Sequence, residues 1–263
     1  MNRDFTIDIY TELLRGLRHQ GYRFQRIEDY MQHPLSRVVM LRHDVDLRNY
    51  AALRLAKVEA KLGINSTYYF RVVKQSYNPE VIRQIVDMGH EIGYHYEDLA
   101  SHNGDYDQAI KSFERNLKKF RKFYPVKTVC MHGSSGSPHD NRDLWGRYNM
   151  HDFGLICEPY LSINYDKVLY LSDTGRRWNG FKMSLRDNVE TSYNFNFYGT
   201  NDILKAIETL PDQILFTAHP EQWVDNLPEW LFVKAFSMAH TFYKVHYRNK
   251  RVIRERGTGS RDL

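Results

Sequence analysis

The sequence is poor in cysteine and has no long apolar segment. Its 263 residues include two cysteines, Cys130 and Cys157, which are too few for a disulfide framework and are expected to be buried thiols in a reducing compartment. No uninterrupted apolar run approaches the roughly 20 residues of a membrane span. The first residues, MNRDFTIDIY, lack the basic flank and apolar core of a signal peptide. These absences predict a cytoplasmic protein without a membrane span.

The sequence has no excess of charge outside its last twenty positions. The formal net charge is +5, and the seven basic and two acidic residues from Lys244 onward account for all of it. A nucleic-acid-binding protein usually spreads basic residues over a folded face, so no nucleic-acid partner is expected. Residues 244–263 are interpreted as a solvated tail. The alternative is an anchor to a nucleic acid or to an acidic membrane surface.

The sequence also lacks a glycine-rich phosphate-binding fingerprint after its first strand-like segment, which weakens a nucleotide-binding open sheet. Strand-like and helix-like segments alternate along the chain, a pattern typical of parallel βαβ units. With 42% hydrophobic residues, the chain fits one α/β domain over residues 1–263. Strands are predicted at 37–44, 65–73, 90–95, 126–133, 168–173 and 213–220, and helices at 11–21, 49–63, 79–89, 105–125 and 201–211.

Polar and chemically capable residues stand at the ends of most predicted strands. The carboxyl ends of the strands in a barrel converge on one face and build the active site there. This arrangement favours a closed barrel over an open sheet. The residues concerned are Arg42 to Asp46, His95 with Glu97 and Asp98, His132, Asp173 and His219.

The stretch RHDVD, residues 42–46, places two carboxylates close together at the end of an apolar strand. Like charges repel, so either one carboxylate is protonated or a cation lies between them. A divalent metal ion resolves this repulsion, because one aspartate can bind the ion while the other acts as a base. The structural alternative is a helix cap with a surface salt bridge to Arg42 or Arg48.

Two histidines at strand ends complete the candidate chemistry. His95, in GHEIGYH, is the favoured nitrogen ligand, because metals such as zinc accept mixed carboxylate and imidazole ligands. On its own it would be interpreted as a hydrogen-bonded core histidine. His219, in LFTAHPEQW, is a candidate proton donor to a leaving group, and Trp223 suggests a pocket wall beside it.

Taken together, these motifs resemble those of the polysaccharide deacetylases, the NodB-like family of carbohydrate esterases. RHDVD resembles the first motif, GHEIGYH the second and FTAHP the last. The resemblance implies an α/β fold, a distorted parallel (β/α) barrel with fewer than eight repeats. It also implies one divalent metal ion, expected to be zinc, and removal of an acetyl group. Asp44 is then the base, Asp46 and His95 are metal ligands, and His219 is the general acid.

The chain departs from the family pattern at two of these motifs. The family places its two aspartates side by side, whereas Val45 separates them here, so either aspartate could be the base. The family also has a second ligand histidine four residues after the first, where this chain has Leu99. His132 is the preferred third ligand. The substitutes are Glu97, Asp98 and His102.

The resemblance also implies residues around the reacting groups. Arg142 or His132 takes the place of the arginine that stands beside the base. YLSDTGRRW occupies the place of an aspartate and a tryptophan that orient and line the site, which assigns those roles to Asp173 and Trp178. The predicted substrate contacts are Trp178, Trp223 and Tyr96.

The sequence therefore predicts a metal-dependent hydrolase that removes an acetyl group from an amino sugar or glycan. Its substrate is expected to be a carbohydrate or a nucleotide-linked sugar. The loss of a ligand histidine at Leu99 supports an alternative, a NodB-like carbohydrate-binding or regulatory protein without catalysis. The sequence indicates no oligomeric state.

Overall fold

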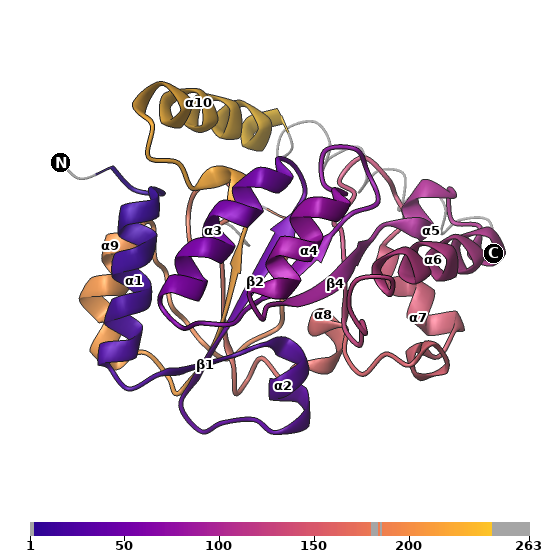
Figure 1. Cartoon of the computed structure of the whole chain (residues 1–263), viewed down its shortest axis with the longest axis horizontal. Coiled ribbons are helices and arrows are strands. Elements are labelled where there is room, and N and C mark those ends of the chain that lie inside the picture. Colours follow the sequence, from indigo (N-terminus) through magenta and orange to yellow (C-terminus); the bar gives the residue numbers. More distant parts are fainter. Residues whose placement is uncertain (1–2, 180–183, 185, 244–263) are drawn as a thin grey trace.

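A parallel β-sheet forms the centre of the molecule (Figure 1). The computed structural model describes residues 3–179, 184 and 186–243, so the predicted basic tail, 244–263, lies outside the described residues. The strand order is β5-β4-β3-β2-β7-β6, and β1 pairs with the first half of β2. The strands are β1 (Arg23–Gln25), β2 (Val38–Val45), β3 (Thr67–Phe70), β4 (Glu91–Tyr96), β5 (Val129–Met131), β6 (Leu169–Ser172) and β7 (Gln213–Ala218).

Helices connect the strands and cover the outside of the sheet (Figure 1). None of the helices within the described residues is long and apolar enough to cross a membrane. The α-helices are α1 (Ile7–His19), α2 (Ile27–Gln32), α3 (Asn49–Lys61), α4 (Pro79–Asp87), α5 (Asp98–Ser101), α6 (Tyr106–Phe120), α7 (Leu144–Arg147), α8 (Pro159–Ser162), α9 (Thr200–Ala206) and α10 (Leu227–Tyr243). Short 3-10 helices are η1 (Asn141–Asp143), η2 (Met150–Phe153), η4 (Ile207–Thr209) and η5 (Pro220–Gln222).

The sheet curls into a partial barrel. Cys130 on β5 and Tyr170 on β6, the two outermost strands of the order, lie in one buried cluster with Met40 and Leu215 from the central strands. A flat sheet would hold its two edges far apart, so this shared cluster requires curvature. The fold is therefore the predicted distorted parallel (β/α) barrel with fewer than eight repeats. Cys130 and Cys157 are buried free thiols, as predicted.

Strand β2 shows how the sequence divides its side chains between the two faces. Side chains alternate along a strand, so every second residue points the same way. Val39 and Leu41 pack in the cluster that includes α1, whereas Met40 packs inside the barrel. Arg42 and Asp44 follow Met40 in the same phase and therefore also face the interior.

His43 of the RHDVD stretch has a structural role on the helical side of β2. Its Nε2 lies 2.7 Å from Glu59 Oε1 on α3, and both side chains are fully buried. Ser66 and Tyr68 donate hydrogen bonds to the other oxygen of Glu59. Burial alone would raise the pKa of Glu59, but His43 and the other donors lower it to about 2. The ionised carboxylate thus joins α3 to strands β2 and β3.

Local signals place several helix boundaries. The side chain of Asn78 accepts hydrogen bonds from the backbone N–H groups of Glu80 and Val81 at the start of α4, and Pro79 occupies the first turn. Gly89, after the end of α4, has a φ of 90°, a conformation that favours glycine. These boundaries agree with the helix predicted at 79–89.

The sequence patterns missed β1, α2 and α10. Strand β1 has three residues, too few to show an alternation. Helix α10 spans 17 residues, but its large apolar side chains are mostly exposed. It therefore lacks the polar outer side that marks an amphipathic surface helix in a sequence. The predicted helix at 105–125 was too long, because α6 ends at Phe120.

We predict that Gly93→Ala destabilises the barrel. A Cβ at Gly93 would overlap the Tyr69 ring and lie 2.8 Å from the backbone oxygen of Thr128, inside a packed interior. Overpacking of this kind costs about 1–3 kcal/mol in the free energy of unfolding, measurable by urea denaturation. The control is Gly146→Ala in α7, where a Cβ meets nothing within 4 Å. Equal stability of the two variants would contradict the tight interior described for β3, β4 and β5.

Candidate active site

The carboxyl ends of the strands surround a cavity of about 440 Å³. Its wall includes polar residues from β2, β4 and the loops that follow β2, β5 and β7, as the barrel prediction required. α10 contributes to the wall from the opposite side. The predicted site residues that line the cavity are Asp44, Asp46, His95, His132 and His219.

Asp44 forms a buried ion pair with Arg42, its neighbour two positions back on β2. Arg42 donates from Nε to Asp44 Oδ1 at 2.9 Å and from Nη2 to Oδ2 at 2.5 Å. Burial alone would raise the pKa of Asp44, but Arg42 and nearby imidazoles, His95 first, lower it below the ordinary value. Asp44 is therefore an ionised carboxylate at neutral pH.

Asp46 lies between two imidazole rings. Its Oδ1 is 3.4 Å from Nε2 of His95 and 3.7 Å from Nε2 of His132. This oxygen is buried and has no hydrogen-bond partner among the described residues. Burial raises the pKa of Asp46, but the imidazoles of His132, His95 and His219 outweigh it and hold the pKa well below its usual range.

Hydrogen bonds to the other ring nitrogens fix both imidazoles. His95 donates from Nδ1 to the backbone oxygen of Cys130 at 2.9 Å, which leaves Nε2 as an acceptor toward the cavity. His132 Nδ1 lies 2.8 Å from Glu97 Oε2, and Arg71 binds Glu97 in turn. Metal-binding histidines usually have such a partner on the second nitrogen. The two rings are therefore oriented as ligands would be.

A second possible donor set shares His95. Asp44, His95 and Cys130 offer atoms that lie within 4.8 Å of one another, and all three residues are buried. However, both oxygens of Asp44 already accept hydrogen bonds from Arg42. Burial also raises the pKa of the Cys130 thiol well above its ordinary value, so the thiolate that binds metals is disfavoured. The chemistry of the donors therefore favours Asp46, His95 and His132.

His219 projects from the end of β7 and is held by Asp173. Its Nδ1 lies 2.6 Å from Asp173 Oδ1, and Trp223 donates from Nε1 to Oδ2 of the same carboxylate at 2.9 Å. Burial alone would lower the pKa of His219, but Asp173 in particular, with Asp46 and Asp44, raises it well above the ordinary value. His219 is therefore protonated at neutral pH, and Nε2 remains for a substrate.

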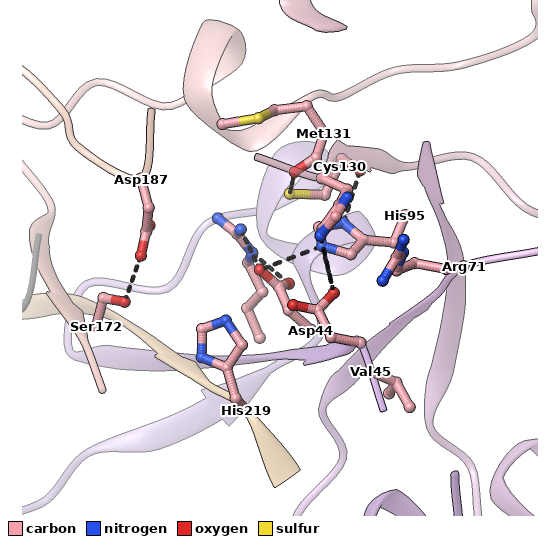
Figure 2. Close-up of polar contacts among 12 residues, drawn as sticks. Asp44, Val45, Arg71, His95, Cys130, Met131, Ser172, Asp187 and His219 are labelled. Carbon is pink, nitrogen blue, oxygen red and sulfur yellow. Dashed lines mark hydrogen bonds and ion pairs between the residues drawn. The ribbon is translucent and has the colours of Figure 1, made fainter. Parts of the chain in front are cut away.

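Figure 2 shows how these groups come together. Asp44 and His95 point into the same space, whereas Val45 points away from it. Val45 is fully buried in the helical cluster. The residue that separates the two aspartates therefore keeps both carboxylates on the interior side of the strand.

The sequence did not indicate Asp187 or Tyr160, which form the wall beside β6. Asp187 accepts hydrogen bonds from Ser172 Oγ at 2.8 Å and from Tyr160 OH at 2.7 Å, and Tyr160 OH accepts one from Arg42 Nη2 at 2.9 Å. These contacts connect Asp187 to the Arg42–Asp44 pair. Asp187 belongs to none of the sequence motifs, so only the structure could place it here.

Several predicted site residues do not line the cavity. Arg142 binds Asp140 at 2.8 Å, and Arg42 occupies the place beside Asp44 that Arg142 was expected to take. Tyr96 faces the helices because it follows His95 on β4, and Trp145 donates a hydrogen bond to its hydroxyl at 2.9 Å. Trp178 is buried in the core and binds Thr200.

Trp223, the third predicted substrate contact, is also fully buried in the core. There it donates a hydrogen bond to Asp173. A substrate-binding role for Tyr96, Trp178 and Trp223 therefore has no support from their placement.

Leu99, which stands where the family has its second ligand histidine, has a packing role in this fold. Leu99 lies on α5 and packs in the core cluster, where it is 1% exposed. Of the substitute ligands, Glu97 binds His132 and Arg71, while Asp98 accepts hydrogen bonds from Tyr94 and Asn116 away from the cavity. His102 Nδ1 bonds the backbone oxygen of Asp98. Of these residues, His132 is the one whose imidazole lies at the cavity near Asp46.

Comparison with known proteins gives matches among solved structures alone. No protein-family model and no curated protein matches the chain. A family 4 carbohydrate esterase from Streptomyces lividans in complex with acetate is 15% identical, over 78% of this chain and 87% of that one, with a TM-score of 0.44. A peptidoglycan deacetylase from Bacillus subtilis is 12% identical, over 80% and 98%, with a TM-score of 0.40.

A third match is a family 4 pseudoenzyme from Bacillus anthracis, 16% identical over 79% of this chain and 62% of that one, with a TM-score of 0.41. Because the identities and TM-scores are low, the fold is described from the strand order and the interior cluster, and the activity is argued from the residues.

We predict that Arg42→Met destabilises the protein by about 3–5 kcal/mol, because it leaves the buried Asp44 carboxylate without its partner. Chemical denaturation measures the loss. The double variant Arg42→Met with Asp44→Asn should recover part of it, since the unpaired charge is gone. The control, Lys118→Met, breaks the exposed pair with Glu114 and should leave stability unchanged. A similar effect of the two single substitutions would show that the Arg42–Asp44 pair is not important for folding.

Proposed function

We propose that the protein is a metal-dependent deacetylase that removes an acetyl group from an amino sugar or glycan. The observation that carries this proposal is the buried, unpartnered Oδ1 of Asp46 between the Nε2 atoms of His95 and His132. Around it stand an ionised carboxylate, Asp44, and a protonated imidazole, His219. A base and an acid beside a set of possible metal ligands suit hydrolysis of an amide or ester.

Asp46, His95 and His132 are the proposed ligands of one divalent ion, and their mixed carboxylate and imidazole donors suit zinc. The ion when bound supplies Lewis acidity, which polarises the acetyl carbonyl and lowers the pKa of water. Asp44 and Cys130 stay outside this ligand set in the proposal. The reason is that Arg42 occupies Asp44 and burial protonates Cys130.

Asp44 is the proposed base. Its carboxylate accepts the proton of the attacking water, and Arg42 holds the carboxylate ionised and in a fixed orientation. The roles of the two aspartates follow from their partners. Arg42 binds Asp44, whereas His132 faces Asp46, and His95 Nε2 lies closer to Asp46 Oδ1, at 3.4 Å, than to Asp44 Oδ2, at 3.8 Å. We therefore keep Asp44 as base and Asp46 as ligand.

His219 is the proposed acid. Asp173 holds Nδ1 and raises the pKa of the ring, so Nε2 carries a proton for the departing amine or alcohol. Trp223 fixes the second oxygen of Asp173 and thereby the orientation of the imidazole. Asp173 is thus a positioning residue that acts through His219.

The cavity suits a small carbohydrate. Its volume of about 440 Å³ is at the lower end of the range for small-molecule sites, and α10 forms one side of it. Glu221 and Gln222 add polar groups to the wall, and burial raises the pKa of Glu221, so its carboxyl can donate as well as accept. We propose a substrate of one or a few sugar units. A nucleotide-linked sugar and a cytoplasmic location remain predictions.

Metal binding tests the ligand set. Equilibrium dialysis of the purified protein against zinc should give about one bound ion. His132→Ala and Asp46→Asn should each weaken binding by at least about tenfold, because each removes a ligand. Cys130→Ser should bind zinc like the wild type. The control is His151→Ala at an exposed histidine. Loss of zinc in Cys130→Ser with retention in His132→Ala would instead assign the ion to Asp44, His95 and Cys130.

Turnover tests the division of roles. Asp44→Asn should keep zinc and reduce acetate release from an N-acetylated oligosaccharide on the order of 100- to 10,000-fold, because an amide cannot accept the proton of water. Asp46→Asn should lose both zinc and turnover. If Asp44→Asn loses the ion while Asp46→Asn keeps it, the two roles are reversed. If the wild type binds zinc and sugar without releasing acetate, the chain is a carbohydrate-binding relative and the catalytic proposal is wrong.

A further inference from the structure

Helix α10 presents an apolar surface to the solvent. Most of its large apolar side chains are about half exposed or more, and Phe232 and Met238 reach 61% and 62%. Val233 is its buried residue. The exposed large apolar residues of α10 are Leu227, Leu231, Phe232, Phe236, Met238, Phe242 and Tyr243. Elsewhere in the described part of the chain, such residues are Leu47, Tyr50, Leu161 and Tyr198.

These side chains form one continuous half of the helix. At 3.6 residues per turn, the outward half comprises apolar residues alone, since the two charged residues of α10, Glu229 and Lys234, fall on the other half. Glu229 binds Arg48 of the barrel at 2.7 Å. We call the middle of this outward half, without Phe236, which also lines the cavity, the α10 face: Leu227, Pro228, Leu231, Phe232, Ala235, Met238 and Ala239.

The α10 face reverses the usual pattern of a surface helix, which is polar toward the solvent. Large contiguous apolar patches on a protein surface mark contacts with another protein or with a membrane. The opposite half of α10, together with Phe236, already has its contacts, because Val233, Phe236, Ser237, His240 and Thr241 line the cavity. The α10 face is therefore left for something outside the chain's own core.

The charge that follows α10 identifies its partner. Residues 244–263 come directly after the helix and carry the entire net charge of +5. We infer that α10 lies flat on an anionic lipid membrane, with the α10 face in the apolar boundary; the net charge of +5 that the sequence carries after the helix is of the sign that anionic headgroups attract. Apolar and aromatic side chains beside clustered Lys and Arg are the features of helices that bind such surfaces.

A second copy of the chain suits the α10 face less well. Two copies would carry the same net charge of +5, and like charges repel. An anionic membrane instead attracts the same charge. Figure 1 places α10 outside the barrel, beside the start of α3, so a flat surface can reach the helix. Because α10 lines the cavity, binding there would place the cavity next to the membrane.

Vesicle binding by the full-length protein tests this inference. Sedimentation should show binding at least about tenfold tighter to vesicles with a quarter of phosphatidylglycerol than to phosphatidylcholine alone, and weaker binding at high salt. Phe232→Glu with Met238→Glu should reduce binding to anionic vesicles at least about tenfold, because two charges enter the apolar boundary. Arg251→Glu with Arg254→Glu should also weaken it.

The matched control is Leu161→Glu, at an apolar residue of α8 that is 50% exposed, which should bind vesicles like the wild type. Circular dichroism checks that each variant is folded. The inference is overturned if the wild type binds neither vesicle, or binds both equally. It is also overturned if light scattering finds a dimer that Phe232→Glu with Met238→Glu converts to a monomer, since a second copy then covers the α10 face.

Discussion

The ion pair between Arg42 and Asp44 is the constraint on which the rest of the site depends. Two charges inside a barrel cost several kcal/mol each unless they are paired, so each residue requires the other. Their positions on alternate places of β2 keep both side chains on the interior side. The pair leaves Asp44 ionised and oriented, and it leaves Asp46 as the carboxylate that faces His95 and His132.

The barrel interior changes from apolar to polar along the strands. Met40 and Leu215 pack in the interior cluster, and two to four residues further along, Arg42, Asp44 and the loop after β7 line or support the cavity. The apolar part holds the sheet in its curled form, and that curvature brings β6 near Arg42 through Tyr160 and Asp187. Stability and the candidate chemistry therefore share one set of strands.

Helix α10 joins the candidate active site to the outer surface. One half of it forms part of the cavity wall, and the other half carries the α10 face. Exposure of the apolar outer half to water is unfavourable, because burial of apolar surface is favoured. A partner bound to the α10 face would therefore contact the same helix that lines the cavity.

The sequence by itself determined the alternation of strands and helices, because the spacing of apolar residues is a local property. It also indicated which polar residues follow the strands, and these gather at one end of the barrel: Asp44, Asp46, His95, His132 and His219. The tertiary structure decided which arginine binds Asp44, since Arg42 and Arg142 are equally plausible until the strand phase is known. It also decided that Tyr96 faces the helices and that Asp187 joins the wall. Those outcomes depend on side-chain direction and on the curvature of the sheet, which bring together residues that no local pattern connects.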